Sequence, residues 1–248
     1  MRDLSVAVFR PDDERLQSAG ELVRSLGATP VEDPLLEVAP TGALPRTDAA
    51  VVVLTSATSA ELLAEAGWEP GEARLAAIGP KTAGALEDVG YAIDIVADEY
   101  TSAGLVETLR PEADGACIEV ARSDHGSDVL LEGLNEAGAY VHETVLYELV
   151  RPAGGGHATV DRLLENDLDV ALFTSSLTVE HLLAAAQERD ALEETLEGLE
   201  SAVVGVIGPP TAETAAAHGI EADVVPEAAT FDALATAAIE RAAPSYHE

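Results

Sequence analysis

Two pairs of hydroxyl residues in the sequence follow apolar runs and could bind anions. Thr55-Ser56 follows the apolar run 49–54, and Thr174-Ser175 follows Leu172-Phe173. A helix that begins after such a strand has free backbone N–H groups and about half a positive charge at its N-terminus. These junctions could therefore bind a carboxylate or a phosphate.

Two Gly-Pro pairs could also form anion-binding helix N-termini, without a hydroxyl side chain. Glycine allows close approach of a ligand, and proline fits the first helical turn without wasting a donor. Two threonines further along each half are predicted N-caps of later helices. The six junctions are Thr55-Ser56, Gly79-Pro80, Thr101, Thr174-Ser175, Gly208-Pro209 and Thr230. Each could be an ordinary helix cap, but their repetition favours a ligand site.

Basic residues are rare in this chain, so their positions are informative. Arg10 and Arg122 follow equivalent predicted strands, where they either contact a ligand or form structural ion pairs. Lys81 is the only lysine and falls in the first turn of its predicted helix, where the helix dipole disfavours a cation. An anionic ligand nearby would explain Lys81, and an acidic partner would explain it equally well.

The elements that must position these residues alternate between strand and helix. Apolar strands are predicted at 4–9, toward Val38, and at 49–54, 75–78, 93–96 and 116–121, with another running through Tyr147. Helices are predicted at 58–66, 81–89 and 127–137, and Pro- and Gly-rich linkers at 39–48 and 152–156. This alternation predicts an α/β protein with parallel sheets covered on both faces.

The chain also contains an internal duplication. Thr55-Ser56 recurs 119 residues later as Thr174-Ser175, and Gly79-Pro80 recurs 129 residues later as Gly208-Pro209. The difference predicts a ten-residue insertion in the charged helical stretch 187–196. Two such domains, facing one another, would form a cleft lined with helix N-termini.

The charge balance excludes several partners. The formal net charge is −33, from 46 acidic and 13 basic residues, so we expect no nucleic acid and no anionic membrane as partner. Acids spread along the helices suit a salt-rich cytoplasm, where charge repulsion is screened. We therefore predict halophilic adaptation rather than a cation-binding function. The sequence has no apolar run of 18 residues and no signal peptide pattern, which predicts a cytoplasmic location.

Motifs for metals and cofactors are absent from the sequence. Cys117 is the only cysteine, and its apolar neighbours predict a small core residue. The six histidines are scattered, and there is no GxGxxG after a strand, P-loop, HExxH or nucleophile elbow. We expect no metal site and no cofactor.

The ordered motifs resemble those of the uroporphyrinogen-III synthase family. They are residues 172–176 (Leu-Phe-Thr-Ser-Ser), 207–212 (Ile-Gly-Pro-Pro-Thr-Ala) with Gly219 after them, the Thr230 segment, and 143–148 (Glu-Thr-Val-Leu-Tyr-Glu) before a linker. Their order extends the resemblance over essentially the whole chain. Some members carry threonine where Pro210 stands here, so a hydroxyl at that place cannot be required in this chain.

The resemblance implies two flavodoxin-like, doubly wound parallel-sheet domains joined by two extended strands. One domain would be discontinuous, comprising 1–36 and 152–248, and the other would span 40–147, with linkers near 37–39 and 148–156. The family uses no cofactor or metal. It converts linear hydroxymethylbilane into uroporphyrinogen III, inverting the last pyrrole ring and losing water, in haem, sirohaem and cobalamin biosynthesis.

The resemblance also implies a substrate with eight carboxylates, bound largely by main-chain groups in a monomer that contacts neighbouring pathway enzymes transiently. Tyr147 matches the family's tyrosine before the second linker and is the predicted catalytic residue; the alternative is a tyrosine packed at a hinge. The predicted substrate-binding residues are Arg10, Thr55, Ser56, Lys81, Thr82, Thr101, Ser102, Arg122, Thr174, Ser175, Ser176, Gly208, Pro209, Thr211 and Thr230.

Two other classes of function are weaker interpretations. A non-catalytic module that senses an anion would need an effector domain, and we expect none in these 248 residues. A flavin or nucleotide binder would need aromatic side chains to stack on the ring, yet only 4% of residues are aromatic and none lies at position 55 or 174. We therefore expect an enzyme.

Overall fold

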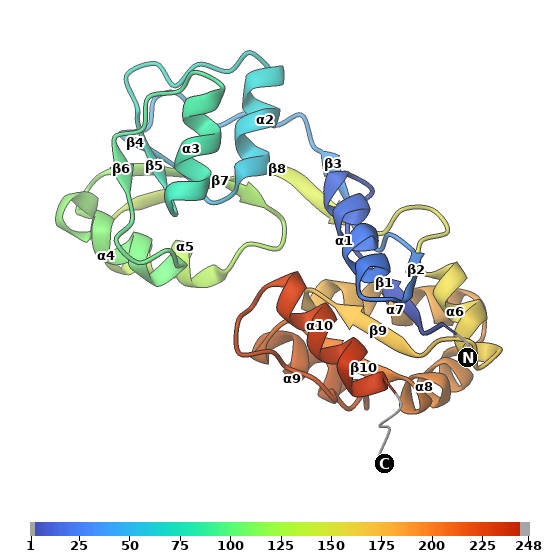
Figure 1. The fold of residues 1–248 in the computed structure, drawn as a ribbon. Helices are drawn as coiled ribbons and strands as arrows, with labels where there is room; N and C mark the ends of the chain where they lie inside the picture. The colour runs from blue at the N-terminus through green and yellow to red at the C-terminus, as the bar shows by residue number, and fades with distance from the viewer. Residues whose placement is uncertain (1–2, 244–248) are drawn as a thin grey trace. The chain divides into compact units, whose positions relative to one another are not determined.

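The computed structural model describes residues 3–243, which divide into two compact units. Unit 1 combines both ends of the chain, up to Glu37 and from Val150 onward, and unit 2 is Val38–Leu149. The sequence-based division was 1–36 with 152–248, and 40–147. Figure 1 shows helices on both faces of a sheet in each unit.

The sheet of unit 1 has four parallel strands. They are β1 (Ser5–Val8), β2 (Thr29–Glu32), β9 (Val170–Phe173) and β10 (Val203–Val206), in the order β10-β9-β1-β2. An isolated parallel bridge between Gly205 and Val224 extends the β10 edge. Strand order 2-1-3-4 with a fifth position beyond it is the flavodoxin-like order.

Helices cover both faces of this sheet because its strands are apolar on both sides. Alternate residues such as Val6 and Val8 pack with α1 (Glu14–Ser25) and α10 (Phe231–Ala242). Ala7 and Phe9 pack on the opposite face. That face is covered by α6 (His157–Leu164), α7 (Ser176–Glu188), α8 (Leu192–Ser201) and α9 (Pro209–Ala217).

The sheet of unit 2 has six strands. They are β3 (Glu37–Pro40), β4 (Val51–Leu54), β5 (Arg74–Ala77), β6 (Ile95–Val96), β7 (Cys117–Ser123) and β8 (Tyr140–Val150), in the order β3-β8-β7-β4-β5-β6. One face carries α2 (Ala57–Glu65) and α3 (Pro80–Asp88), and the other carries α4 (Ser102–Ala113) and α5 (Asp128–Glu136). The predicted α/β class with parallel sheets is therefore confirmed.

The duplication seen in the sequence is visible in the strand order. In unit 2 the series β8-β7-β4-β5-β6 is equivalent to β2-β1-β9-β10 and the Val224 bridge in unit 1. The predicted insertion corresponds to an additional helix, α8, because unit 2 has only α2 between β4 and β5. The equivalent strand-helix-strand segments are β1-α1-β2 in unit 1 and β7-α5-β8 in unit 2. The segment comes first in the chain in unit 1 and last in unit 2.

Three details differ from the sequence-based prediction. The single strand expected toward Val38 is two strands, because β2 pairs in unit 1 whereas β3 lies beside β8. The predicted burial of Cys117 is wrong, since its side chain is exposed. It lies one residue before Ile118, the first β7 residue that β4 pairs with, so the sheet covers it poorly. Helix α4 continues through Pro111 to Ala113, whereas the sequence pattern predicts a helix that ends at Leu109.

Local sequence explains how the helices start and stop. Serine, threonine or aspartate side chains cap several helix N-termini, and glycines at positive φ follow their C-termini, as at Gly27 (φ 80°) and Gly90 (φ 100°). No helix within residues 3–243 is long and apolar enough to cross a membrane.

Candidate active site

The carboxyl ends of the parallel strands are where an open α/β sheet binds ligands, especially where the strand order reverses. In unit 1 the reversal lies between β1 and β9, and in unit 2 it lies between β7 and β4. Arg10 and Thr174-Ser175 follow the first pair of strands, and Arg122 and Thr55-Ser56 are at the ends of the second. Each unit therefore brings its predicted arginine and hydroxyl pair to its own reversal point.

Among the helices that start at strand carboxyl ends, five share an unusual composition, whereas α1, α5 and α10, which follow β1, β7 and the Val224 bridge, do not. The first turns of α2, α3, α4, α7 and α9 contain no acidic residue. Acids are favoured in a first turn, and 46 of the 248 residues are acidic. Helices α1, α5, α8 and α10 do carry acids there. Five positive helix ends are therefore left without a carboxylate from their own first turn.

Hydroxyl side chains of the predicted junctions cap four helices, namely α2, α4, α7 and α10. Ser56 accepts from the N–H of Ser59 (3.3 Å), and Thr101 accepts from the N–H of Gly104 (3.0 Å). In unit 1, Ser175 and Thr230 accept equivalent bonds (3.3 Å each). Each cap satisfies one N–H group and leaves others in the first turn without an intrahelical partner.

The remaining predicted hydroxyls differ in their exposure. Thr55, Ser102 and Thr174 are partly exposed, whereas Thr82 and Thr211 are buried, with 5% and 3% of their surface accessible. Ser176 donates to the carbonyl of Pro210 (3.2 Å) and accepts from Thr214 (2.8 Å). Thr82 and Thr211 are therefore less accessible to a ligand than Thr55, Ser102 and Thr174.

The two Gly-Pro starts are not equivalent as anion sites. Neither Gly79 nor Gly208 provides a side-chain cap, and each is followed by proline. In α3 the next residues, Lys81 and Thr82, both have backbone N–H groups, but in α9 Pro210 lacks one and only Thr211 supplies a donor. The start of α3 therefore offers one more donor and a cation.

Tyr147 lies at the carboxyl edge of unit 2 and contacts another predicted site residue. Its side chain is 6% exposed and packs in the core beneath α2 and α3. Its hydroxyl donates a hydrogen bond to Oγ of Ser56, the N-cap of α2, over 3.0 Å. In the sheet Tyr147 pairs with Ser123 at the end of β7. The structure thus joins a residue from the β8 end to one from the β4 end.

Arg10 is a half-buried cation without an anionic partner. Its guanidinium lies 5.1 Å from the ring centroid of Phe231, and no hydrogen bond or ion pair engages it among residues 3–243. Burial lowers the pKa of Arg10, and the charge of Arg15 lowers it further, while Asp13 and Asp232 act in the opposite direction. Because an arginine stays charged at neutral pH, an anion bound here would be stabilised.

Arg122 is engaged within the protein. Only 4% of its surface is exposed, and its Nε lies 2.6 Å from Oε1 of Glu143. It also donates to the carbonyl of Ser127 (2.5 Å), and a side chain at Gly126 would collide with it. These contacts favour the structural ion pair over ligand contact for Arg122. Sequence reasoning missed Glu143 as its partner because the pairing crosses strands.

Lys81 is exposed and makes no ion pair within the described part of the chain. It lies in the first turn of α3, at the end of β5. The acidic partner that could have explained its position is therefore not found among residues 3–243. An anion from outside the protein remains the better explanation.

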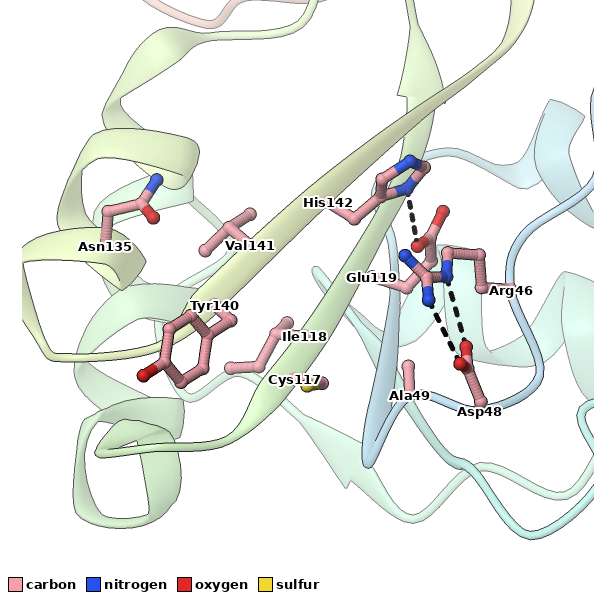
Figure 2. Close-up of a pocket in the computed structure, with 10 residues that line it drawn as sticks. All are labelled: Arg46, Asp48, Ala49, Cys117, Ile118, Glu119, Asn135, Tyr140, Val141 and His142. Carbon is pink, nitrogen blue, oxygen red and sulfur yellow. Dashed lines mark hydrogen bonds and ion pairs between the residues drawn. The ribbon is translucent and has the colours of Figure 1, made fainter.

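A separate cavity of about 330 Å³ lies at the opposite, amino edge of the unit 2 sheet (Figure 2). Glu119 in its wall is 1% exposed and is bound by the Thr144 hydroxyl and by Nδ1 of His142 (2.8 Å). Nearby, Arg46 hydrogen-bonds Asp48 and holds the pKa of that carboxyl below its ordinary value. The charged groups of this cavity satisfy one another, and none belongs to the carboxyl edge.

Groups of histidine, cysteine and acidic side chains that could hold a metal ion are not found within residues 3–243. The carboxyl edges offer helix N-termini, hydroxyls, two cations and a buried phenol instead. Such groups bind anions and can donate one proton, and they are suited to a ligand with many carboxylates.

The sequence of this chain is similar to those of known proteins. A family model described as "HEM4: Uroporphyrinogen-III synthase HemD" matches residues 17–236. A Methanothermobacter thermautotrophicus protein named "Putative uroporphyrinogen-III synthase" is 34% identical over 250 residues, covering 94% of this chain and 97% of that protein. The "Uroporphyrinogen-III synthase" of Synechococcus elongatus is 25% identical over 207 residues, covering 77% and 78%.

Solved structures resemble the fold. A mutant uroporphyrinogen III synthase of Thermus thermophilus matches with a TM-score of 0.63 at 20% identity, covering 96% of this chain and 98% of that one. The uroporphyrinogen-III synthetase of Helicobacter pylori matches with a TM-score of 0.62 at 16% identity, covering 97% and 100%. At these identities the likeness concerns the fold alone.

Proposed function

The chain belongs to the uroporphyrinogen-III synthase HemD family, and from this membership we propose how its own residues carry out the reaction. It is a cyclising hydro-lyase of tetrapyrrole biosynthesis. It closes linear hydroxymethylbilane into uroporphyrinogen III, inverting the last pyrrole ring and releasing water. The substrate carries eight carboxylates, so binding must offer many anion sites.

The observation that carries this proposal is the set of five helix N-termini without first-turn acids. A helix N-terminus binds a carboxylate through its free N–H groups and its dipole. In a chain of formal charge −33, first turns free of acids avoid local repulsion of an anionic substrate. The proposed binding groups are the first-turn N–H groups and the partly exposed hydroxyls of Thr55, Ser102 and Thr174.

Two cations complete the proposed binding groups. Arg10 is half-buried and unpaired among the described residues, so a substrate carboxylate would restore its lost solvation. Lys81 adds an exposed charge at the start of α3. Arg122 has a different proposed role, because its guanidinium is already occupied by Glu143 and Ser127.

Tyr147 is the proposed catalytic acid. The hydroxyl group of the bilane leaves more readily if it receives a proton, and the C–O bond then breaks to give an electrophilic azafulvene and water. The Tyr147 phenol is hydrogen-bonded to Ser56, the N-cap of α2, and packs beneath α2 and α3, beside their proposed anion sites. Because only 6% of Tyr147 is exposed, neighbouring side chains keep bulk water away from the phenol.

Product analysis tests the proposed function. Purified protein is supplied with hydroxymethylbilane in molar KCl, and the isomers formed are separated after oxidation. We expect uroporphyrinogen III in excess over a reaction without protein, which closes without inversion to isomer I. Isomer I alone, from protein shown to be folded, would contradict the function.

We also propose halophilic adaptation, a cytoplasmic location and a monomeric state with transient contacts to neighbouring pathway enzymes. The support for halophily is the charge of −33 on a regularly folded chain. At 1 M salt the Debye length is about 3 Å, which screens the repulsion among surface acids. Unfolding followed by circular dichroism should show lower stability in dilute buffer than in molar KCl. Equal stability in both would remove the basis for halophily.

A further inference from the structure

The hydroxyl of Ser56 lies at the centre of three hydrogen bonds in unit 2. Its Oγ is 3.0 Å from the Tyr147 hydroxyl, 3.3 Å from the N–H of Ser59 and 3.0 Å from Oγ of Ser59. Tyr147 is 6% exposed and Ser59 is fully buried. This small network is therefore shielded from water on the protein side.

The donor and acceptor roles in the network follow from simple counting. A serine hydroxyl has one proton and two acceptor lone pairs. Ser56 Oγ accepts from the Tyr147 O–H and from the Ser59 N–H, which occupies both lone pairs. Its own proton must then point to Oγ of Ser59. In the substrate-free protein, Ser56 is an acceptor for Tyr147.

We propose that Ser56 is a positioning residue that reverses its hydrogen bond to Tyr147 during the reaction. This inference rests on the proposed role of Tyr147 as the catalytic acid. When the phenol O–H turns from Ser56 to the substrate, the Ser56 hydroxyl turns from Ser59 to the phenol oxygen. Ser56 then donates to the oxygen on which negative charge develops, and hydrogen bonds to charged groups are stronger than neutral ones.

The protons balance without any other reactant. The phenol proton goes to the departing hydroxyl of the bilane, the C–O bond breaks with its electron pair on oxygen, and water leaves. The phenolate is held by the Ser56 O–H and is paired with the cationic azafulvene. After ring closure the carbon that formed the new bond loses its proton, which returns to the phenolate. Ser56 keeps its own proton throughout and changes only its direction.

The equivalent serine in unit 1 shows that capping alone does not require this arrangement. Ser175 caps α7 within a capping box, and its partner Thr178 donates to the Ser175 carbonyl (2.6 Å). No tyrosine engages Ser175 among residues 3–243. In unit 2 the residue in the Thr178 place, Ser59, instead directs its hydroxyl toward Ser56. The N3 hydroxyl thus points to the cap hydroxyl only in the unit where Tyr147 binds that cap.

The experiment compares Ser56→Ala, Ser56→Thr and Tyr147→Phe, and the double variant Ser56→Ala/Tyr147→Phe, in steady-state assays with hydroxymethylbilane. We expect Ser56→Ala to lower kcat roughly tenfold with little change in KM, which is the lower end of the range for one charge-assisted hydrogen bond. Ser56→Thr keeps a hydroxyl and should restore most of kcat. The double variant should be no slower than Tyr147→Phe alone, because the two residues act as one unit.

Loss of the helix cap is controlled separately. Ser127 caps α5 in the same unit without any tyrosine contact, so Ser127→Ala should lower stability by a similar amount and leave kcat unchanged. Ser56→Gly provides a second variant that removes the hydroxyl at a cap position where glycine costs only a few tenths of a kcal/mol. It should show the same kcat loss as Ser56→Ala even if the alanine variant folds poorly.

The outcomes separate this inference from the proposed function. If Tyr147→Phe lowers kcat but Ser56→Ala and Ser56→Gly do not, the reversal is wrong and the catalytic role of Tyr147 stands. Additive losses in the double variant would also overturn the coupling. Unchanged kcat in Tyr147→Phe would remove both the catalytic acid and the inference built on it, while the isomer assay would still test the overall function.

Discussion

The carboxyl edges of the two units share a scaffold but differ in the groups they present. Both have acid-free helix starts after equivalent strands and a serine cap on the helix that follows the Thr-Ser pair. Unit 1 has Arg10 without an anionic partner among residues 3–243, whereas the equivalent Arg122 of unit 2 is buried in an ion pair. The two edges therefore share helix starts of the same kind, while equivalent side chains differ in their partners.

The difference also extends to the second pair of helix starts and to the phenol. Unit 2 has Lys81 where unit 1 has Pro210, and Tyr147 donates to Ser56 while Ser175 has only local partners. Under the proposed function, the proton donor and Lys81 belong to unit 2, and the half-buried guanidinium of Arg10 belongs to unit 1. The following variants test this division of roles.

The largest expected effect comes from Arg122. Arg122→Ala removes a buried guanidinium, leaves a space in the protein and deprives the Ser127 carbonyl of its donor, while the exposed Glu143 carboxylate can be solvated; it should cost about 2 kcal/mol of unfolding free energy. Chemical unfolding in molar KCl measures the loss. Arg110→Ala, which breaks an exposed pair with Glu107 in the same unit, should change stability little. A stable Arg122→Ala protein with a raised KM would instead indicate that Arg122 contacts the substrate.

Tyr147→Phe should have the next largest effect. Loss of the proton donor should lower kcat at least about tenfold, and more isomer I should form as released bilane closes spontaneously. Tyr91→Phe is the matched control, because that hydroxyl donates to the Trp68 carbonyl (2.8 Å) and is absent from the proposed site. Equal turnover of Tyr147→Phe and Tyr91→Phe would leave Tyr147 a packing residue only.

Arg10→Ala should affect binding rather than catalysis. Removing the unpaired guanidinium should raise KM about fivefold with little change in kcat, as expected when one charged contact to substrate is lost. Stability should fall little, because the residue makes no ion pair among residues 3–243 and only its contact with Phe231 is lost. Arg24→Ala, an exposed arginine paired with Glu32, should leave KM unchanged. An unfolded Arg10→Ala protein would argue for a structural role like that of Arg122.

Lys81→Ala should produce the smallest effect. The side chain is exposed, so KM should rise only about twofold, and the difference from the native protein should shrink as KCl is increased because exposed charges are screened. Lys81→Arg should behave like the native protein. A difference in KM that does not depend on salt would show that Lys81 acts by a means other than charge.

Much of the fold could be predicted from local patterns. Apolar runs of strand length, helix-start residues and glycine stops located most elements within a few residues, because each signal acts over a few neighbouring positions. The split into β2 and β3 was not predictable, since both halves are extended and only partner strands decide to which sheet each belongs. The exposure of Cys117 depended in the same way on where β4 begins pairing.

The site could be predicted only in part. Thr-Ser and Gly-Pro junctions, Tyr147 and the three cations were visible as residue types at helix starts and strand ends. The absence of acids from five first turns was present in the sequence but needed accurate helix boundaries to be noticed. The burial of Thr82 and Thr211 followed from how α3 and α9 pack, which a junction motif does not specify.

The sequence alone determined the duplicated α/β pattern and the positions of its helix starts, because strand and helix formation depend on local periodicity and capping. Only the tertiary structure decided which cations are free and which hydroxyls meet. Arg10 and Arg122 look equivalent in sequence, yet pairing across β7 and β8 brings Glu143 to Arg122 alone. Tyr147 and Ser56 are 91 positions apart, and the order of parallel strands brings their hydroxyls to 3.0 Å.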